Sequence, residues 1–192
     1  MNLLPYLENG FSYPDYLKKI EEQLHDIENS GDEKGYAKYY SINLKRIERL
    51  DKTFDLTDEQ KERLNKFNSD FKLLVISEGW CGDAAQVMPV VNVMMNEIGV
   101  EQKIVLRDEN PELMNEFLTD GAKSIPILIG VNNEGNEIFR FGPRPQHGME
   151  LLKKHKENPQ EYTDEQFHQD LQVWYNRDKG VGIFEEFLSK MN

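Results

Sequence analysis

The chain has 192 residues, of which 38% are hydrophobic and 30% charged, and its 35 acidic and 23 basic side chains give a net charge of −12. This length and composition suit one globular domain with an extension and exclude a disordered chain. The negative charge argues against nucleic acid and anionic membranes as partners, and no apolar run approaches the roughly 18 residues of a transmembrane helix.

Residues 1–69 have the apolar spacing of helices. Apolar side chains recur at steps of three and four within 16–27 and again within 36–50, which predicts two amphipathic helices. Residues 30–32, Ser-Gly-Asp, separate these two helices. Residues 57–60 have the Thr-x-x-Gln form of a capping box and open a third, short helix. We expect this segment to be a helical extension packed on the core.

From residue 70 onward, strands and helices alternate. Short apolar runs bounded by turn residues predict strands at 71–76, 103–107, 125–131 and 137–141. Apolar residues at helical spacing predict helices at about 83–98, from 111, at 146–156, from 163 to 175 and at 183–188. The turn at 133–136 joins the last two strands into a hairpin. This order of elements predicts an α/β fold.

The motif Trp-Cys-Gly-Asp at residues 80–83 follows the first strand directly. Together with the order of elements, this placement resembles the thioredoxin fold. Pro89 lies eight residues after the cysteine, where thioredoxins have the proline that kinks their active-site helix. Residues 108–111 are similar to the Asp-x-Asn-Pro that follows the next strand in many thioredoxins.

Two further landmarks support the resemblance. Residues 124–126, Ser-Ile-Pro, are similar to the segment that carries the thioredoxin cis-proline, and Gly142 falls where thioredoxins place a glycine after the hairpin. The resemblance implies a central mixed four-stranded sheet flanked by helices, over a core of residues 70–157. The helices of residues 1–69 and 158–192 are additions to that core, and we treat the whole chain as one domain. It is similar to a bacterial thioredoxin family whose Trp-Cys-Gly-Asp motif lacks the second cysteine.

Cys81 is the only cysteine of the chain, which excludes an intramolecular disulfide and suits a reducing compartment. With no signal peptide in residues 1–10, we expect a cytoplasmic location. Ala84 stands where thioredoxins have the resolving cysteine, and Val75 where they keep a buried aspartate. The resemblance then implies a monothiol thiol–disulfide oxidoreductase with Cys81 as nucleophile. Its partner would be a protein disulfide or a low-molecular-weight thiol, and an external thiol would resolve the mixed disulfide, with no cofactor or metal.

The resemblance also implies a substrate groove around this thiol. Its expected residues come from the motif, from the start of the third strand and from the end of the hairpin: Trp80, Gly82, Asp83, Ile125, Pro126, Gly142 and Arg144. A thiol at a helix N-terminus is favoured as the thiolate, whereas the charge of Asp83 disfavours it. We expect Arg107 and Arg144 to decide this balance.

Other interpretations stay open. Cys81 is either reactive or inert, and an inert thiol would leave a redox-inactive binding protein that keeps the groove and uses the N-terminal helices as a partner surface. A third option is a metal or cluster that bridges a dimer through one Cys81 from each subunit. The aromatic pairs Tyr36 with Tyr40 and Trp174 with Tyr175 are interpreted as core. The four histidines do not have the spacing of a metal site.

Overall fold

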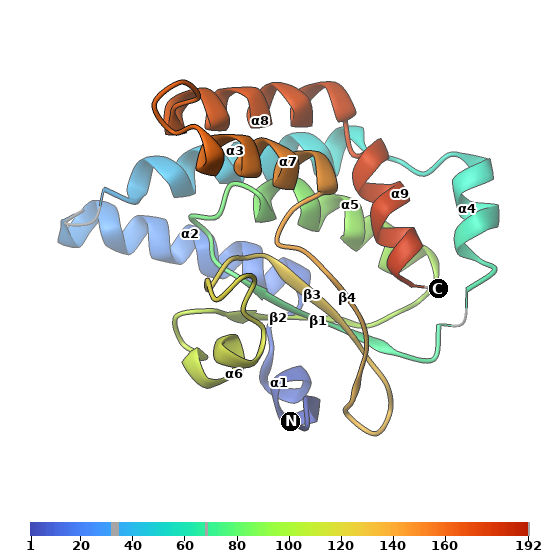
Figure 1. Cartoon of the computed structure of the whole chain (residues 1–192). Coiled ribbons are helices and arrows are strands. Elements are labelled where there is room, and N and C mark those ends of the chain that lie inside the picture. Colours follow the sequence, from blue (N-terminus) through green and yellow to red (C-terminus); the bar gives the residue numbers. More distant parts are fainter. Residues whose placement is uncertain (32–34, 68, 192) are drawn as a thin grey trace.

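Strand β1 (Lys72–Ser77) is the centre of the fold because it has a partner on each side (Figure 1). It runs parallel to β2 (Gln102–Leu106) and antiparallel to β3 (Ile127–Val131), which pairs with β4 (Glu137–Phe141). The resulting sheet has the order β2-β1-β3-β4. The expected α/β class with a mixed four-stranded sheet is therefore confirmed. The computed structural model describes residues 1–31, 35–67 and 69–191.

The N-terminal segment is helical, as its spacing predicts. Its helices are α1 (Leu4–Asn9), α2 (Tyr13–Ser30), α3 (Ala37–Thr53) and α4 (Asp58–Leu64). The break after α2 falls at Gly31, while Asp32 lies outside the described residues. Helix α1 was not predicted. It leads to Phe11, which exchanges two backbone hydrogen bonds of 2.8 Å with Ile104 and so covers part of the outer edge of β2.

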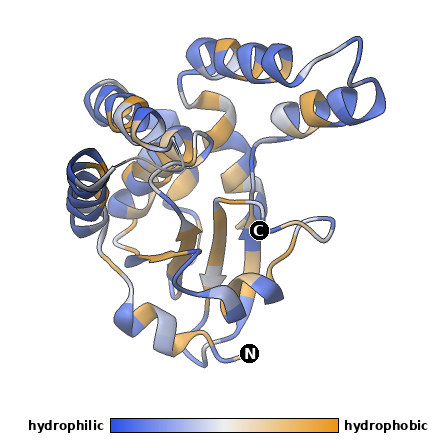
Figure 2. Ribbon diagram, turned by 90° about the vertical axis from the view of Figure 1, so that its left-hand side faces the viewer, coloured by the Kyte–Doolittle hydropathy of each residue, from blue (hydrophilic) through white to orange (hydrophobic). Residues whose placement is uncertain are grey.

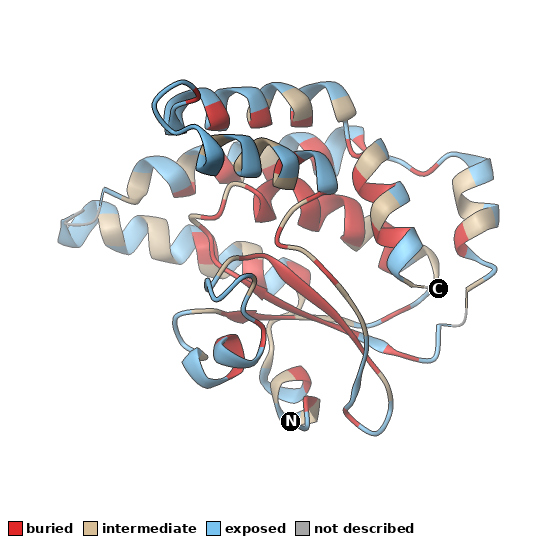
Figure 3. Cartoon of the chain, in the orientation of Figure 1, coloured by how far each residue is buried: buried red, intermediate tan, exposed pale blue. Residues whose placement is uncertain are grey.

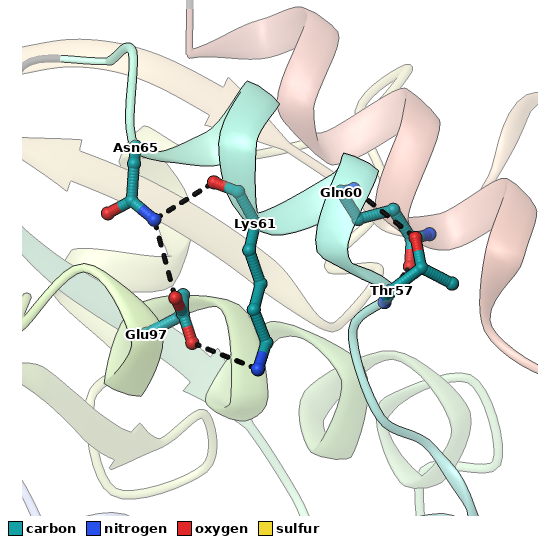
Figure 4. Close-up of polar contacts among 5 residues, drawn as sticks. All are labelled: Thr57, Gln60, Lys61, Asn65 and Glu97. Carbon is teal, nitrogen blue, oxygen red and sulfur yellow. Dashed lines mark hydrogen bonds and ion pairs between the residues drawn. The ribbon is translucent and has the colours of Figure 1, made fainter.

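The capping box predicted at residues 57–60 is present at the start of α4 (Figure 4). The backbone N–H of Gln60 donates to Thr57 Oγ1, and the backbone N–H of Thr57 donates to Gln60 Oε1. At the other end of α4, the Asn65 amide donates to Glu97 at 3.3 Å, and Lys61 forms an ion pair of 4.0 Å with the same carboxylate. These contacts connect the extension to the end of the next helix, α5.

Helix α5 (Ala84–Glu97) begins just after the Cys81 turn and is the most buried helix of the described chain (Figure 3). It packs against α3 and against α9 (Val181–Lys190), and Pro89 lies inside it. Figure 1 shows α7 (Gln146–Glu157) and α8 (Asp164–Asp178) on the same side of the sheet, where they pack on each other. Helix α6 (Pro111–Glu116) lies toward the opposite side with α1.

Hydrophobic residues gather on the sheet and on the helix faces that turn toward it (Figure 2). Tyr40 and Tyr175 are buried, in agreement with their interpretation as core, whereas Tyr36 and Trp174 are only partly buried and pack against the core, and Tyr36 also lines the groove described below. Among the described residues, no helix is both long and apolar enough to cross a membrane.

Gly142 lies where the end of the hairpin passes the segment before β3. Its φ is +117°, and a Cβ added there would come within 2.1 Å of the carbonyl oxygen of Pro126. The Ile125–Pro126 peptide bond is cis, as the resemblance implies. Gly142 is therefore needed both for its backbone conformation and for the close approach of the two loops.

We expect Gly142→Ala to lower the free energy of unfolding by about 2–4 kcal/mol, because the added Cβ meets a backbone atom that cannot move alone. Urea unfolding measures this loss. Gly121→Ala is the control, since Gly121 also has a positive φ of +78° but no atom within 4 Å of the added Cβ. The control is expected to lose about 1 kcal/mol. Equal losses in the two variants would contradict the role of the loop contact.

Glu78 connects the ends of the two parallel strands. It follows β1, and its Oε1 accepts a hydrogen bond of 2.8 Å from the backbone N–H of Asp108, just beyond β2. Its side chain is enclosed, and burial raises the pKa of its carboxyl group to about 7. The folded chain therefore favours the protonated form of this acid.

This shift predicts a pH-dependent stability. Between about pH 4.5 and 7 the folded chain binds more protons at Glu78 than the unfolded chain, so stability falls as the pH rises through this window. We expect Glu78→Gln to reduce the difference in unfolding free energy between about pH 5 and pH 8 by about 2 kcal/mol. Urea unfolding at both pH values measures it.

Glu101→Gln is the control, because a hydrogen bond from Lys72 lowers the pKa of Glu101 and its removal acts with the opposite sign. A pH dependence left unchanged by Glu78→Gln would rule out the role assigned to Glu78.

Candidate functional site

Cys81 lies in the tight turn between β1 and α5. Its backbone N–H donates to the Glu78 carbonyl at 3.1 Å, and its own carbonyl accepts from Ala85 at 3.2 Å. The Cys81 thiol donates to the Ile125 carbonyl at 3.3 Å, and Sγ accepts from the backbone N–H of Ala84 at 3.4 Å. The residue is only 7% exposed, so it is buried.

The surroundings of Cys81 favour the neutral thiol. Burial raises the pKa of this thiol to about 12, and the charge of Asp83 acts in the same direction. The backbone N–H groups of Ala84 and Asp83 and the guanidinium of Arg144 lower it, but by less. The effect expected from Asp83 is therefore present. The helix N-terminus and Arg144 do not outweigh burial, because few water molecules can solvate a thiolate here.

The Asp83 carboxylate pairs with two other side chains. One carboxylate oxygen forms an ion pair of 2.7 Å with Arg144, and the other accepts a hydrogen bond of 2.7 Å from the hydroxyl group of Tyr175. Asp83 is buried, and burial raises the pKa of its carboxyl group while Arg144 opposes the shift. The three side chains come from the motif, from the loop before α7 and from α8. They join the C-terminal helices to the motif.

Trp80 packs against an arginine and a tyrosine. The Arg107 guanidinium lies 4.6 Å from the centre of the indole ring, and the ring of Tyr36 lies 5.7 Å away. Arg107 also donates to the Lys123 carbonyl at 3.2 Å and to the Asp108 carboxylate at 2.8 Å. Arg107 therefore packs on Trp80 and pairs with Asp108, whereas Arg144 is the arginine that lowers the pKa of the thiol.

Helix α3 forms the wall beside the motif. The Asn43 amide donates to the Gly79 carbonyl at 3.0 Å, and its oxygen accepts from Arg46 at 2.9 Å. A Cβ added to Gly82 would lie 3.1 Å from Nη1 of Arg46, so the absence of a side chain at Gly82 makes room for the guanidinium. The extension thus contributes a positioned arginine to the site.

These elements enclose a groove of about 780 Å³. Of the expected site residues, six line it: Trp80, Cys81, Gly82, Asp83, Ile125 and Arg144. Pro126 and Gly142 are not among the lining residues and instead hold the adjoining loops together. No three His, Cys, Asp or Glu side chains gather as a metal-binding group in the part of the chain that the structure describes.

The groove also contains residues that sequence reasoning missed. Asn43 and Arg46 come from α3, and His168 and Gln172 come from α8. Tyr175 was interpreted as core and is buried, but its hydroxyl group also reaches the motif. No local motif marks these residues. Only the packing of the two extensions on the core brings them to the thiol.

The sequence was compared with known protein families and curated proteins. Residues 31–160 match the family described as Thioredoxin. Thioredoxins of Listeria monocytogenes and Listeria innocua are each 35% identical over 80 residues, which cover 40% of this chain and 74% of theirs.

Solved structures match over the full length of the chain. A protein of unknown function from Pseudomonas aeruginosa has a TM-score of 0.66 at 16% identity, over 100% of this chain and 97% of that one. An HIV epitope scaffold has a TM-score of 0.64 at 16% identity, over 100% and 98%. These likenesses establish the fold, which is the expected thioredoxin-like one. With the family match over residues 31–160, the chain belongs to the thioredoxin family.

Proposed function

We propose that this chain is a redox-inactive binding protein, whose groove holds a segment of a partner protein while Cys81 remains a neutral thiol. One observation carries this proposal: the thiol is buried and donates its hydrogen bond to the Ile125 carbonyl. A group that donates through its S–H proton must lose that bond when it ionises, and burial adds the cost of desolvating the thiolate.

The positions that dithiol exchange needs support the same proposal. Ala84, at the place of the resolving cysteine, is buried and has no group that attacks a mixed disulfide. Val75, at the place of the buried aspartate, pairs with Ile104 and Leu128 inside the sheet. Proton transfer from the thiol therefore has no acid or base at that position. A reducing cytoplasm, where a lone thiol persists without a partner, is the compartment that we propose.

Monothiol exchange is a second candidate, because Cys81 borders the groove and Sγ accepts a hydrogen bond from Ala84. In this reaction the Cys81 thiolate would attack a protein disulfide, form a mixed disulfide and release the other sulfur as a thiolate. An external low-molecular-weight thiolate would then attack the substrate sulfur of the mixed disulfide. This step forms a disulfide between the external thiol and the substrate and releases the Cys81 thiolate. The Cys81 thiol would first lose its proton to solvent, and the thiolate released from the substrate would take up a proton from solvent.

The two candidates differ in how fast Cys81 reacts with iodoacetamide. Because its pKa is raised to about 12, we expect alkylation at neutral pH to be about 1,000-fold slower than for a free cysteine. The rate should still rise with pH above 9, without a plateau. Mass spectrometry of timed samples measures it, and the same chain unfolded in guanidinium is the control. A plateau below about pH 8, with mixed disulfides formed from small thiols, would overturn the proposal and support exchange.

Asp83 provides a second test with the sign worked out. The negative charge of Asp83 raises the pKa of Cys81. Asp83→Asn removes this charge and frees the Arg144 guanidinium to act on the thiol. We expect alkylation at about pH 8 to become about tenfold faster, which corresponds to one pKa unit. Asp108→Asn is the control, because this exposed aspartate pairs with Arg107 instead. An unchanged or slower reaction in Asp83→Asn would contradict the electrostatic account.

A further inference from the structure

The groove beside Cys81 is positively charged in a strongly acidic protein. Its lining contains four basic side chains and two acidic ones, namely Arg46, Arg107, Lys123 and Arg144 against Asp83 and Asp164. The whole chain, in contrast, carries a net charge of −12. A local excess of positive charge inside a concave site favours an anionic occupant.

Arg46 is the half-buried arginine of this lining for which the described residues provide no ion pair. Arg144 forms an ion pair with Asp83, and Arg107 forms one with Asp108. Among the described residues, no carboxylate lies within ion-pair distance of the Arg46 guanidinium, whose hydrogen-bond partner is the neutral amide of Asn43. Burial lowers the pKa of Arg46 and the neighbouring charge of Arg49 acts in the same direction, while Asp83 and Tyr175 oppose the shift without reversing it. A partly desolvated cation of this kind gains most from a bound anion.

Arg46 is also held in position. Asn43 is 1% exposed, and it connects the guanidinium to the Gly79 carbonyl at one end of the Cys81 turn. At the other end, Gly82 leaves the space that Nη1 occupies. The side chain is therefore ordered before a ligand arrives, which reduces the entropy lost on binding.

We propose that Arg46 binds a carboxylate of an acidic segment of a partner protein, so that the groove selects acidic sequences. This inference rests on the proposed function of the groove as a binding site for a partner segment. The planar guanidinium matches a carboxylate through two parallel hydrogen bonds.

The shape and rim of the groove favour a peptide over a small acid. Its volume of about 780 Å³ is larger than a single carboxylic acid fills. Tyr39 and Ile42, both on α3 and both lining the groove, are each 46% exposed. They offer an apolar contact for a side chain next to the bound carboxylate. A long polyanion such as nucleic acid is repelled by the net charge of −12, whereas a short acidic segment is confined to the basic groove.

Two fluorescein-labelled octapeptides test the proposal, one with alternating Glu and Leu and the other with alternating Gln and Leu. Neither peptide contains cysteine, so disulfide chemistry does not contribute. Fluorescence anisotropy with the full chain measures both affinities. We expect the Glu peptide to bind about tenfold more tightly, and this preference to shrink at high salt.

The variants assign the preference to one residue. Arg46→Gln is expected to remove the preference for the Glu peptide while the Gln peptide binds as before, and Arg46→Lys is expected to restore part of it. The matched control is Arg49→Gln, since Arg49 lies one turn further along α3 but bonds to Asn176 and Gln86. It should keep the preference. Circular dichroism checks that every variant is folded.

The outcomes separate the inference from the function on which it rests. If both peptides bind equally, or if Arg49→Gln loses as much preference as Arg46→Gln, the role of Arg46 is wrong and the groove remains a binding site. If neither peptide binds, the proposed function and the inference both fail. If succinate binds as tightly as the Glu peptide and displaces it, the site takes small acids and the peptide assignment is overturned.

Discussion

The site depends on the enclosure of the Cys81 turn, in which Gly79, Cys81 and Asp83 are buried. The turn follows β1, whose pairing with β2 and β3 fixes where the chain leaves the sheet. The Cys81 thiol donates a hydrogen bond to the Ile125 carbonyl, and the Asn43 amide donates one to the Gly79 carbonyl. Asp83 forms an ion pair with Arg144 and accepts a hydrogen bond from Tyr175. These contacts come from the core and from both extensions, so the extensions help to hold the Cys81 turn in place.

The added helices line the groove beside a thiol whose burial opposes ionisation. An exposed turn would leave Cys81 with the N–H groups of the helix start and with water, both of which favour a thiolate. Here Cys81 is buried, and Asp83 adds a negative charge nearby. The loss of a second cysteine at Ala84 agrees with this arrangement, since a thiol that seldom ionises seldom forms a mixed disulfide that must be resolved.

The sequence predicts most of the fold because its local signals agree with one another. The capping box at Thr57 and the apolar run before Trp80 are local, and the predicted helices and strands fall close to their observed bounds. Helix α1 was missed, since it is short and is held by Phe11 on the edge of β2. In the groove, residues of the motif were predicted from the resemblance. Arg46 was not, because its role depends on tertiary contacts between α3 and the motif.

The same enclosure that suppresses the thiolate strengthens the other electrostatic interactions of the groove. The attraction between two opposite charges is stronger where water is scarce, whereas a buried charge without a partner is costly. Asp83 has such a partner in Arg144, and the two approach to 2.7 Å. Arg46 occupies the same environment with only the amide of Asn43. Burial thus disfavours the ionised form of Cys81, and it leaves a guanidinium whose chemistry suits the carboxylate that we propose it binds.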